Sequence, residues 1–392
     1  MKTLNLSPTD DVFVQDPYAA YTRARRDGPV LFWQDYGMYA AFDAATVQAL
    51  LRDRRLGRAP PQGARQYPDR MADWALVEAH SMLELEPPRH TRLRGLVLRA
   101  FTSRRIAALR PDIEDITAEL LANLPDEPFD LIPAFCTQLP VRIIARLLGV
   151  PEDIWPDLLR WSNTMVAMYQ ANRSRAIEDA ANQAAREFTV FLRGYVHQRR
   201  NDPRDDLITH LIAAEEDGEK LSTDELIGTC ILLLNAGHEA TVHSLGNAVK
   251  CLLENATDPA LLGPDHIAAT VEELLRFDPP LHMFTRFAYE DIVLGDITVK
   301  KGNEIALMLG SAGRDPALFD DPEVFAPLRP AKPHAAFGGG LHFCVGAPLA
   351  RLELQIALPA LFAHVPGMRL AEVPRYADAY HFHKLDRLRV RL

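Results

Sequence analysis

A cysteine that follows a glycine-rich loop is the strongest candidate in this sequence for a residue with a chemical function. Cys344 comes shortly after the glycines at 338–340 and just ahead of an apolar segment that we predict to be helical from Pro348 to about Ala363. A thiol at a helix N-terminus lies near unpaired backbone N–H groups and the positive end of the helix dipole, and both favour the thiolate. Glycines let the backbone approach a flat, bulky group closely. Because a thiolate is one of the few axial ligands that prepare haem iron to cleave an O–O bond, the loop is a candidate haem site.

Two other interpretations of the loop need no metal. A single cysteine near a helix often serves as a small buried hydrophobic residue. A run of glycines can also cradle phosphate, but such a loop follows a strand, and residues 332–336 (Lys-Pro-His-Ala-Ala) are a poor strand. No Lys-Ser or Lys-Thr pair follows the glycines. The loop alone therefore leaves a ligand cysteine and a structural cysteine both open.

A second chemical feature lies inside a long predicted helix, which residues 222–225 (Ser-Thr-Asp-Glu) begin as a capping box. Its apolar middle, residues 231–234, is followed by Asn-Ala-Gly-His-Glu-Ala-Thr at 235–241. Glycine inside a helix costs about 1 kcal/mol relative to alanine, and a buried glutamate costs more unless it is paired or hydrated. Such violations inside a strong element often mark function, although a polar stripe on a solvent-facing helix has the same pattern. Gly237 and Glu239 are therefore candidate functional residues.

Charged residues at helical spacing form a third group. Glu273 and Arg276 are three positions apart in a segment predicted as a helix that ends at Asp278. His90 and Arg94 are four positions apart, so they share one face of a helix. Pairs of this kind also decorate solvent-facing helices, and none of them indicates a site by itself.

The remaining pattern predicts a chain rich in helices. Further helices are predicted at residues 17–28, 103–124, 139–149 and 173–200. Strands are predicted at residues 30–33 with 38–42, at 292–294 with 297–300, and at 388–392. The order and spacing of these elements predict a mainly α fold with small β-sheets.

Composition limits the classes of function. The formal net charge of −10 argues against general nucleic-acid binding. The first residues lack an apolar signal segment, and no stretch reaches the ~20 apolar residues that span a membrane. The four cysteines are widely spaced and form no Cys-x-x-Cys pair, which argues against a zinc site or a disulfide framework. We therefore expect a cytoplasmic protein without a nucleic-acid or membrane partner.

One segment reverses the overall sign of the charge. Residues 89–105 contain no acid and carry the arginines Arg89, Arg92, Arg94, Arg99, Arg104 and Arg105. A solvated basic helix face explains this pattern without any partner. On an acidic protein the same segment could instead steer a negatively charged partner to this surface.

Residues 337–353 resemble the haem-binding signature of the cytochromes P-450, F-G-x-G-x-H-x-C-x-G-x-x-L-A-R-x-E. Further motifs of that family occur in the family's order along nearly the whole chain. The resemblance implies a single haem domain over residues 1–392, mainly α with small β-sheets, in which a long central helix lies over haem b. It also implies that Cys344 is the axial ligand of the haem iron, with Phe337 and Gly338 beside the haem.

The resemblance implies cations for the two haem propionates. His90 and Arg94 match the family's H-x-x-x-R, and the acid that usually precedes this motif is here Glu86. Arg286 and His342 match two further propionate contacts. Each residue type is common on surfaces, and the evidence lies in their ordered occurrence together.

The pair Glu273 and Arg276 matches the family's E-x-x-R, and Arg329 completes the motif. By resemblance, these three residues form a structural network under the haem and take no part in catalysis.

Residues 236–241 resemble the family's A-G-x-[D/E]-T-[T/S] segment, which bends the long helix beside the iron. The resemblance implies that Ala236 and Gly237 line the haem and that Glu239 is the acid of a proton relay. The alcohol expected after the acid is replaced by Ala240, and Thr241 is rotated by about 100° around the helix axis. We expect an ordered water or a hydroxyl of the substrate to take the role of the missing alcohol.

By the same resemblance, substrate contacts come from residues 67–74, 161–169 and 281–284, the long helix and the turn 381–383. We predict an apolar, adaptable pocket with contacts from Met165, Met168, Met283, Phe284 and Phe382. Each of these side chains is also typical of an ordinary core. Polar contacts from His282, His381 and His383 stay open.

The resemblance implies a haem-thiolate monooxygenase that inserts one oxygen atom of O2 into an apolar small molecule. Electrons are expected from a ferredoxin and an NAD(P)H-dependent ferredoxin reductase, with the ferredoxin docked on the basic segment. The absence of the alcohol at Ala240 makes a peroxide-driven peroxygenase the alternative, whereas Glu239 favours reductive activation of O2. A non-catalytic haem protein that senses or carries a gas needs neither the acid nor a docking surface for a donor.

Overall fold

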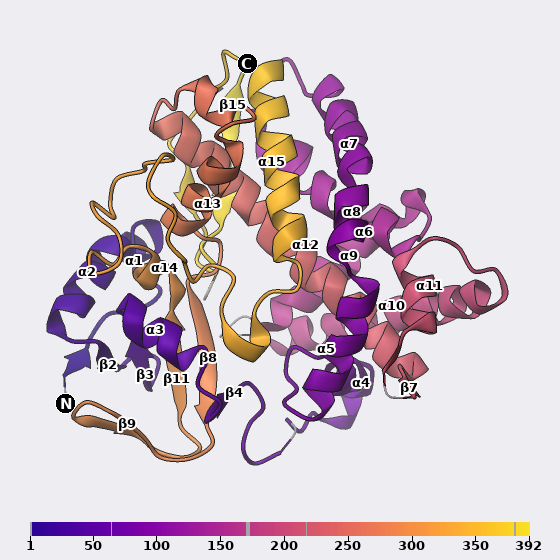
Figure 1. The fold of residues 1–392 in the computed structure, drawn as a ribbon, viewed down its shortest axis with the longest axis horizontal. Helices are drawn as coiled ribbons and strands as arrows, with labels where there is room; N and C mark the ends of the chain where they lie inside the picture. The colour runs from indigo at the N-terminus through magenta and orange to yellow at the C-terminus, as the bar shows by residue number, and fades with distance from the viewer. Residues whose placement is uncertain (1, 64, 170–172, 217, 380–381) are drawn as a thin grey trace.

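The computed structural model describes residues 2–63, 65–169, 173–216, 218–379 and 382–392 (Figure 1). The α-helices are α1 (Asp11–Gln15), α2 (Tyr18–Asp27), α3 (Ala44–Leu50), α4 (Ala72–His80), α5 (Arg89–Ala100), α6 (Ser103–Ala108), α7 (Arg110–Ala122), α8 (Gln138–Leu148), α9 (Trp155–Val166), α10 (Arg175–Asn201), α11 (Leu207–Ala213), α12 (Thr223–Glu254), α13 (Ile267–Phe277), α14 (Leu309–Gly313) and α15 (Ala347–His364). The strands are β1 (Thr3–Leu4), β2 (Val30–Trp33), β3 (Met38–Ala41), β4 (Leu56–Gly57), β5 (Phe129–Asp130), β6 (Glu215–Glu216), β7 (Glu219–Lys220), β8 (Met283–Ala288), β9 (Ile292–Leu294), β10 (Ile297–Val299), β11 (Glu304–Met308), β12 (Arg369–Leu370), β13 (Arg375–Tyr376), β14 (Leu385–Arg387) and β15 (Arg389–Arg391).

Helix α12 is the central element of the fold (Figure 1). The Ser222 side chain accepts a hydrogen bond from the Glu225 N–H, and the Glu225 carboxylate accepts one from the Ser222 N–H, which completes the predicted capping box. The helix is buried around most of its circumference and contacts α4, α8, α9, α10 and α15. A helix that is apolar nearly all round belongs in a protein interior, so α12 holds its polar residues inside the fold.

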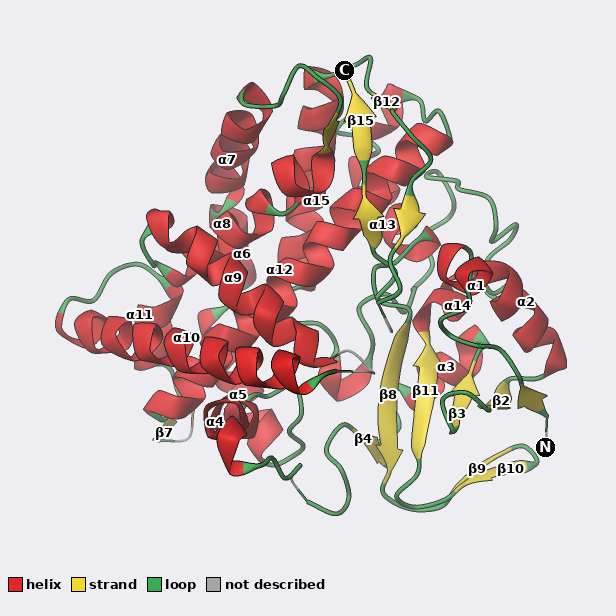
Figure 2. Ribbon diagram, turned by 180° about the vertical axis from the view of Figure 1, so that it is seen from behind, coloured by secondary structure: helices red, strands yellow, loops and turns green. Residues whose placement is uncertain are grey.

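A six-stranded sheet lies to one side of the main group of helices (Figure 2). Its strand order is β1-β2-β3-β11-β8-β4, in which β3 and β11 are parallel and β11 and β8 are antiparallel. Successive side chains of a strand point to opposite faces. On β8, Met283 therefore packs into the core cluster on one face of the sheet, and Phe284 packs against the cluster on the other.

The observed elements confirm the predicted fold class, and the predicted hairpins form as β2–β3 and β9–β10. The prediction of one helix over residues 103–124 is wrong, because the chain forms α6 and α7, separated at Leu109. Pro111 lies in the first turn of α7 and lacks the N–H that would continue the preceding helix. In the described parts of the chain, no helix is long and apolar enough to cross a membrane. The single-domain organisation stays a prediction.

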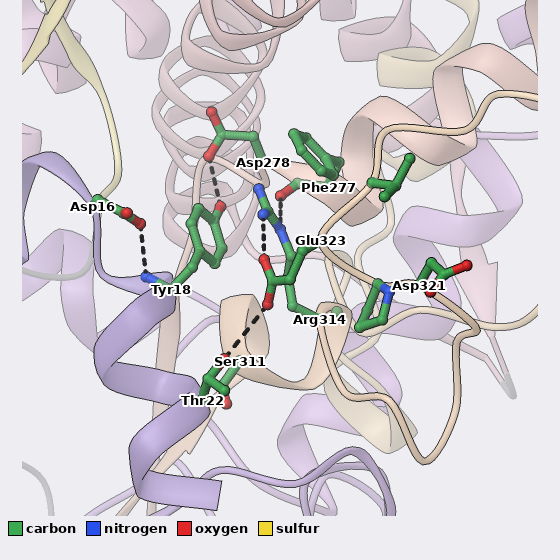
Figure 3. A network of polar contacts seen from close by, with 12 residues as sticks. Asp16, Tyr18, Thr22, Phe277, Asp278, Ser311, Arg314, Asp321 and Glu323 are labelled. Atoms are coloured by element: carbon green, nitrogen blue, oxygen red, sulfur yellow. Dashed lines mark hydrogen bonds and ion pairs between the residues drawn. The ribbon is translucent and has the colours of Figure 1, made fainter.

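A buried polar network joins α2 to the end of α13 (Figure 3). The Tyr18 hydroxyl donates to the Asp278 carboxylate (Oη–Oδ1 2.6 Å). Arg314 pairs with Glu323 (2.7 Å) and donates to the Phe277 carbonyl (2.9 Å). The network satisfies polar groups that would otherwise be costly to bury between the two helices.

The same network contains a possible set of metal ligands. Asp278, His282 and His383 place ligand atoms within 4.8 Å of one another. The Tyr18 hydroxyl, however, lies 2.6 Å from Asp278 and 3.3 Å from Nε2 of His282, so it already bridges two of the three residues. We interpret the set as a structural hydrogen-bonded network.

Candidate active site

The glycine-rich loop before α15 folds tightly against two neighbouring segments. Gly340 adopts a φ of +65°, and a Cβ at this position would lie 2.3 Å from the Leu51 carbonyl oxygen. Gly338 adopts a φ of +70°, and a Cβ there would lie 3.0 Å from the ring of Phe284. Glycine is therefore required at both positions, by its backbone conformation and by the close approach of neighbours.

Cys344 lies between this loop and the start of α15. Its backbone N–H donates to the Phe337 carbonyl (3.0 Å), and α15 begins at Ala347. Burial raises the pKa of the Cys344 thiol above its ordinary value, although the N–H groups of Gly346 and Ala347 and the charge of Arg94 act in the opposite direction. This differs from the thiolate that the helix N-terminus predicts, because desolvation is the larger effect here. A metal ion bound to the sulfur removes the thiol proton outright, so a buried thiol still suits a metal ligand.

Basic side chains gather beside the loop. The rings of His90 and His342 lie 4.3 Å apart. Burial, and then the charges of His342 and Arg94, lower the pKa of His90 to about 4. Nδ1 of His90 is buried and finds no hydrogen-bond partner among the residues that the structure describes. Arg94 donates to the Phe343 carbonyl of the loop (2.7 Å), so residues predicted from two distant motifs meet here.

Two further arginines lie in this region. Burial, and then the charge of Arg58, lower the pKa of Arg286 on β8 to about 10. Arg58 pairs with Glu84 (2.7 Å), and Nε2 of His342 lies 3.0 Å from Oε1 of Glu86. Arg58 is missing from the sequence prediction, since no motif or helical spacing marks it. Its position directly after β4, the strand that pairs with β8, is the signal that places it here.

This environment fits a flat cofactor with two carboxylates. Three arginines supply positive charge at Arg58, Arg94 and Arg286, and His90 keeps a ring nitrogen available. Charge-assisted hydrogen bonds to carboxylates are the interactions that such donors form best. The loop around Cys344 provides a sulfur ligand at the same place. The donor set and the unsatisfied nitrogen thus agree with the haem b implied by the sequence.

One narrow face of α12 is accessible, although the rest of the helix is buried. Leu233, Ala236, Gly237 and Ala240 are partly or well exposed, whereas the residues between them are buried. Their spacing places them on one side of the helix. Since other helices enclose α12, this surface faces the interior of the molecule. The small residues predicted beside the haem therefore lie on the side of α12 that has room.

Gly237 and Thr241 also have clear structural roles. A Cβ at Gly237 would lie 2.9 Å from Cδ1 of Ile144, so its lack of a side chain permits the close approach of α8. The Thr241 hydroxyl donates to the Gly237 carbonyl (2.8 Å), and the Ser244 hydroxyl donates to the Ala240 carbonyl (2.8 Å). These hydroxyls satisfy the helix backbone. Thr241 therefore does not replace the alcohol that is missing at Ala240, which agrees with its predicted rotation.

Two basic side chains hold Glu239. Nε2 of His243 lies 3.0 Å from Oε1 of Glu239, and Nζ of Lys384 lies 3.4 Å from the same oxygen. Burial raises the pKa of Glu239, but the hydrogen bond and charge of His243, with the charge of Lys384, outweigh burial and lower it to about 2. Glu239 is therefore ionised. Lys384 lies 145 positions away in the chain, which is why sequence patterns missed it.

A cavity of about 290 Å³ opens beside Glu239. Its walls come from α9 and the turn after it, from α12, from Thr137 before α8, and from the segment between β13 and β14. Phe382 lines this cavity, whereas Met165 and Met168 are buried in the helical core. Sδ of Met165 lies 3.8 Å from Nδ2 of Asn235, so Met165 still packs against α12.

The other predicted substrate residues are dispersed. Met283 packs into the core on one face of the sheet, and its pocket contact stays a prediction. The alternation of side chains along β8 sends Phe284 to the opposite face and against the Cys344 loop. His282 and His383 belong to the buried network of α2 and α13. His381 lies outside the described residues.

The structure brings Glu273, Arg276 and Arg329 together. Arg276 donates twice to the Glu273 carboxylate (Nε–Oε2 2.7 Å and Nη2–Oε1 2.8 Å), and Nε of Arg329 lies 3.4 Å from Oε1. The backbone N–H of Ala326 adds a fourth bond to the same carboxylate (2.8 Å). The pair is nearly inaccessible to solvent, as a structural network requires.

Comparison with known proteins gives consistent results. A sequence profile of the family described as Cytochrome P450 matches residues 267–364. The chain is 37% identical over 388 residues to the polyketide biosynthesis cytochrome P450 PksS of Bacillus subtilis (strain 168), covering 95% of this chain and 94% of that protein. It is 37% identical over 375 residues to 6-deoxyerythronolide B hydroxylase of Saccharopolyspora erythraea (92% and 91% covered). It is 38% identical over 367 residues to vitamin D(3) 25-hydroxylase of Pseudonocardia autotrophica (92% and 89% covered).

The fold has solved counterparts as well. The structure matches that of P450BioI in complex with hexadec-9Z-enoic acid ligated acyl carrier protein, with a TM-score of 0.90 and 33% sequence identity over 97% of this chain and 99% of that chain. Identity of this extent over nearly complete chains, together with the haem signature at Cys344, leads to one conclusion. The chain belongs to the cytochrome P450 family and is a monooxygenase that binds haem b.

Proposed function

We propose that this enzyme inserts one oxygen atom of O2 into an apolar small molecule and receives its electrons from a separate ferredoxin and its NAD(P)H-dependent reductase. The observation that carries the proposal is the meeting of the Cys344 loop and its basic cluster, with Glu239 held ionised on the central helix. When bound, the haem supplies the activation of O2 and the transfer of the oxygen atom. The side chains bind the haem, orient the substrate and hold protons.

Cys344 would hold the haem iron through its sulfur, and the basic cluster would hold the propionates. The sequence motifs suggest this role for His90, His342, Arg94 and Arg286. We add Arg58, which lies near Arg286. In the described structure, Glu84 and Glu86 accept hydrogen bonds from this cluster. We infer that these acids fix the orientation of Arg58 and His342 and leave the other donors for the propionates.

Glu239 is the proposed acid of the proton relay, at a helix position where Ala240 supplies no hydroxyl. His243 and Lys384 fix the carboxylate and keep it charged. A fixed carboxylate can accept a proton from water and pass it on without a large rearrangement. An ordered water or a substrate hydroxyl completes the relay in place of the missing alcohol.

The proposed substrate contacts are Met165, Met168, Met283, Phe284 and Phe382. Methionine and phenylalanine side chains adapt to irregular apolar shapes, which supports an apolar substrate. The names of relatives refer to 6-deoxyerythronolide B and to vitamin D(3), and that of a solved counterpart to hexadec-9Z-enoic acid. These three compounds are the first panel of candidate substrates to test.

The proposed docking surface for ferredoxin surrounds the outer side of the Cys344 loop. Leu341 and Phe343 of the loop and Leu98 of α5 are exposed, with 38%, 41% and 46% of their surface accessible. Arg94 of α5 donates to the Phe343 carbonyl of this loop (2.7 Å), and a basic helix beside an apolar surface suits an acidic partner. Arg92 pairs with Glu225 and Arg105 with Asp205, so the segment is less basic than its sequence suggests. We also propose a cytoplasmic location, where such donors are found.

The test compares two oxidant systems on the purified, haem-loaded protein. Each panel compound is incubated with NAD(P)H, ferredoxin and reductase, or with hydrogen peroxide alone. The proposal predicts product with the electron-transfer proteins in an O2-dependent reaction. Product with peroxide only would establish the peroxygenase, which the absence of an alcohol at Ala240 favours. A red-shifted CO complex with no product from any compound would contradict both.

A further inference from the structure

A carboxyl group on α4 lies inside the molecule without a cation of its own. Burial, and then the charge of Glu84, raise the pKa of Glu78 to about 7. The residue nevertheless keeps accessible surface, so it borders an interior space. Within the described parts of the chain, Glu78 forms no ion pair, and its hydrogen-bond donor is the Tyr169 hydroxyl (Oη–Oε1 3.4 Å). An ionised carboxylate is costly to bury without a partner, so a positive charge would stabilise this group.

The nearby arginines are engaged elsewhere or exposed. Arg58 pairs with Glu84 (2.7 Å), and we assign its remaining donors to the haem propionates. Arg65 is exposed. The charges of both arginines lower the pKa of Glu78, but burial and the charge of Glu84 outweigh them. Two carboxyl groups therefore share one guanidinium, and this part of the interior has an excess of negative charge.

Aromatic side chains surround the same carboxyl group. Trp74 and Glu78 are four positions apart on α4, so they share one face of the helix. The ring of Tyr169, in the turn after α9, packs edge to face against Trp74 (ring centroids 6.2 Å apart). Burial and the charge of Glu78 raise the pKa of Tyr67, which places this third ring near the carboxylate. Trp74 is 2% exposed and supports Tyr169 from behind, whereas Tyr67 and Tyr169 keep accessible surface.

An ammonium group that carries alkyl substituents fits these side chains best. The faces of aromatic rings attract cations, and a carboxylate beside them supplies the opposite charge. A calcium or magnesium ion would need six or more oxygen ligands, including water, and two tyrosines with one carboxylate are a poor set for it. An anion would be repelled by Glu78 and Glu84. An uncharged apolar group would leave the carboxylate desolvated and unpaired.

We propose that Glu78, with the rings of Tyr67 and Tyr169, binds a positively charged nitrogen of the substrate, so that the enzyme selects apolar compounds that carry an amine. The inference rests on the proposed function, because it names the substrate class of that reaction. Tyr169 also lines the cavity beside α12, and Phe382 lies in the wall of the same cavity. The apolar part of a ligand held at Glu78 would therefore extend along Tyr169 toward α12.

The test measures binding to the purified, haem-loaded enzyme by isothermal titration calorimetry. Three probes share one alkyl chain and differ in charge: octyltrimethylammonium is positive, N,N-dimethyloctanamide is uncharged and octanoate is negative. The quaternary nitrogen has no lone pair and cannot bind iron. Glu78→Gln removes the charge at nearly the same shape. Its matched control is Glu114→Gln on α7, the same change in a side chain that is 53% exposed.

The unchanged enzyme should bind octyltrimethylammonium more tightly than the other two probes. Glu78→Gln should weaken binding of the cation by roughly tenfold or more and leave binding of the amide unchanged. Glu114→Gln should change neither. Equal affinities of the unchanged enzyme for the cation and the amide would overturn the proposal. So would an equal loss for both probes in Glu78→Gln, because that result indicates a general structural effect.

Two further measurements do not depend on the folding of Glu78→Gln. Between one pH unit above and one below about 7, protonation of Glu78 should weaken binding of the cation to the unchanged enzyme by roughly tenfold, with no effect on the amide. Tyr169→Leu should weaken the cation by roughly fivefold, whereas Tyr169→Phe, which keeps an aromatic face, should lose less. Binding of the cation that is independent of pH, or equal losses in the two Tyr169 variants, would contradict the proposal.

These binding measurements use no electron donor and no oxidant. If the cation fails to bind selectively, the inference is refuted and the proposed insertion of oxygen stands. If the electron-transfer proteins support no product from any compound, the proposed function is refuted, even where the calorimetry locates the cation at Glu78.

Discussion

Removing Glu273 should destabilise the protein through one identifiable effect, an unpaired buried charge. In the Glu273–Arg276 pair, 4% of the glutamate side chain and 2% of the arginine side chain are accessible to solvent. Glu273→Ala removes two hydrogen bonds from Arg276 (2.7 and 2.8 Å) and leaves its guanidinium with carbonyl acceptors at Gly313 and Pro322. Breaking a buried pair in this way costs about 3–5 kcal/mol. Because domains are stable by only about 5–15 kcal/mol, the variant should lose a large share of its stability and of its haem.

The assay is urea unfolding of the purified variants, followed by far-ultraviolet circular dichroism and haem absorbance. The matched control is Glu114→Ala on α7, which breaks an ion pair with Arg110 whose side chains are 52% and 53% exposed. An exposed pair contributes at most about 1 kcal/mol, so this variant should stay close to the unchanged protein. A loss for Glu273→Ala as small as that of Glu114→Ala would refute the reasoning.

A double variant separates the unpaired charge from the loss of packing. Replacing both members of the pair with apolar residues, Glu273→Leu with Arg276→Met, removes the charge that the single change strands. Apolar replacement of a whole buried pair is often neutral or stabilising. The double variant should therefore be more stable than Glu273→Ala. If it is less stable, the stranded charge is not the main cost.

Three further predictions follow from the site. Arg94→Leu should lower the haem-to-protein ratio without preventing folding, and a full complement of tightly held haem would contradict its role at a propionate. Burial raises the pKa of Glu239, but His243 and Lys384 lower it from 4.5 to about 2. Its ionised form therefore stabilises the fold above about pH 4.5, and this contribution is lost as the pH falls toward 2. Unfolding free energies of Glu239→Gln should show a weaker dependence on pH in that range, and an unchanged slope would count against the pairing. Ala240→Thr should change the ratio of product formed to NAD(P)H consumed, and the same ratio in both proteins would show that the missing alcohol does not limit coupling.

The sequence predicted the parts of the site that depend on short spacing. Cys344, the pair Glu273 and Arg276, and the capping box that starts α12 each occupy a few adjacent positions. Local geometry fixes how such residues face one another, so their spacing carries the information. The ionisation state of the Cys344 thiol was predicted less well. Burial raises its pKa more than the backbone N–H groups at the start of α15 lower it, and burial depends on tertiary packing.

Contacts between distant segments could not be predicted in this way. Lys384 reaches Glu239 across 145 positions, and Arg58 reaches the basic cluster through the pairing of β4 with β8. Gly237 is needed where α8 approaches α12, which no pattern within the helix reveals. The sequence also does not show which face of the sheet Met283 and Phe284 of β8 each occupy. These outcomes depend on how elements pack, and a single sequence specifies packing only indirectly.

If the sulfur of residue 344 binds the haem iron, its removal must change the absorption spectrum, which is measured on Cys344→Ala. The matched control is Cys136→Ala, which changes a free, fully buried cysteine elsewhere in the fold. We expect Cys344→Ala either to lose its haem or to show a reduced CO complex without the red shift that a thiolate ligand gives, whereas Cys136→Ala should keep its haem and the red shift. Haem retained by Cys344→Ala with an unaltered spectrum would show that the sulfur does not bind the iron.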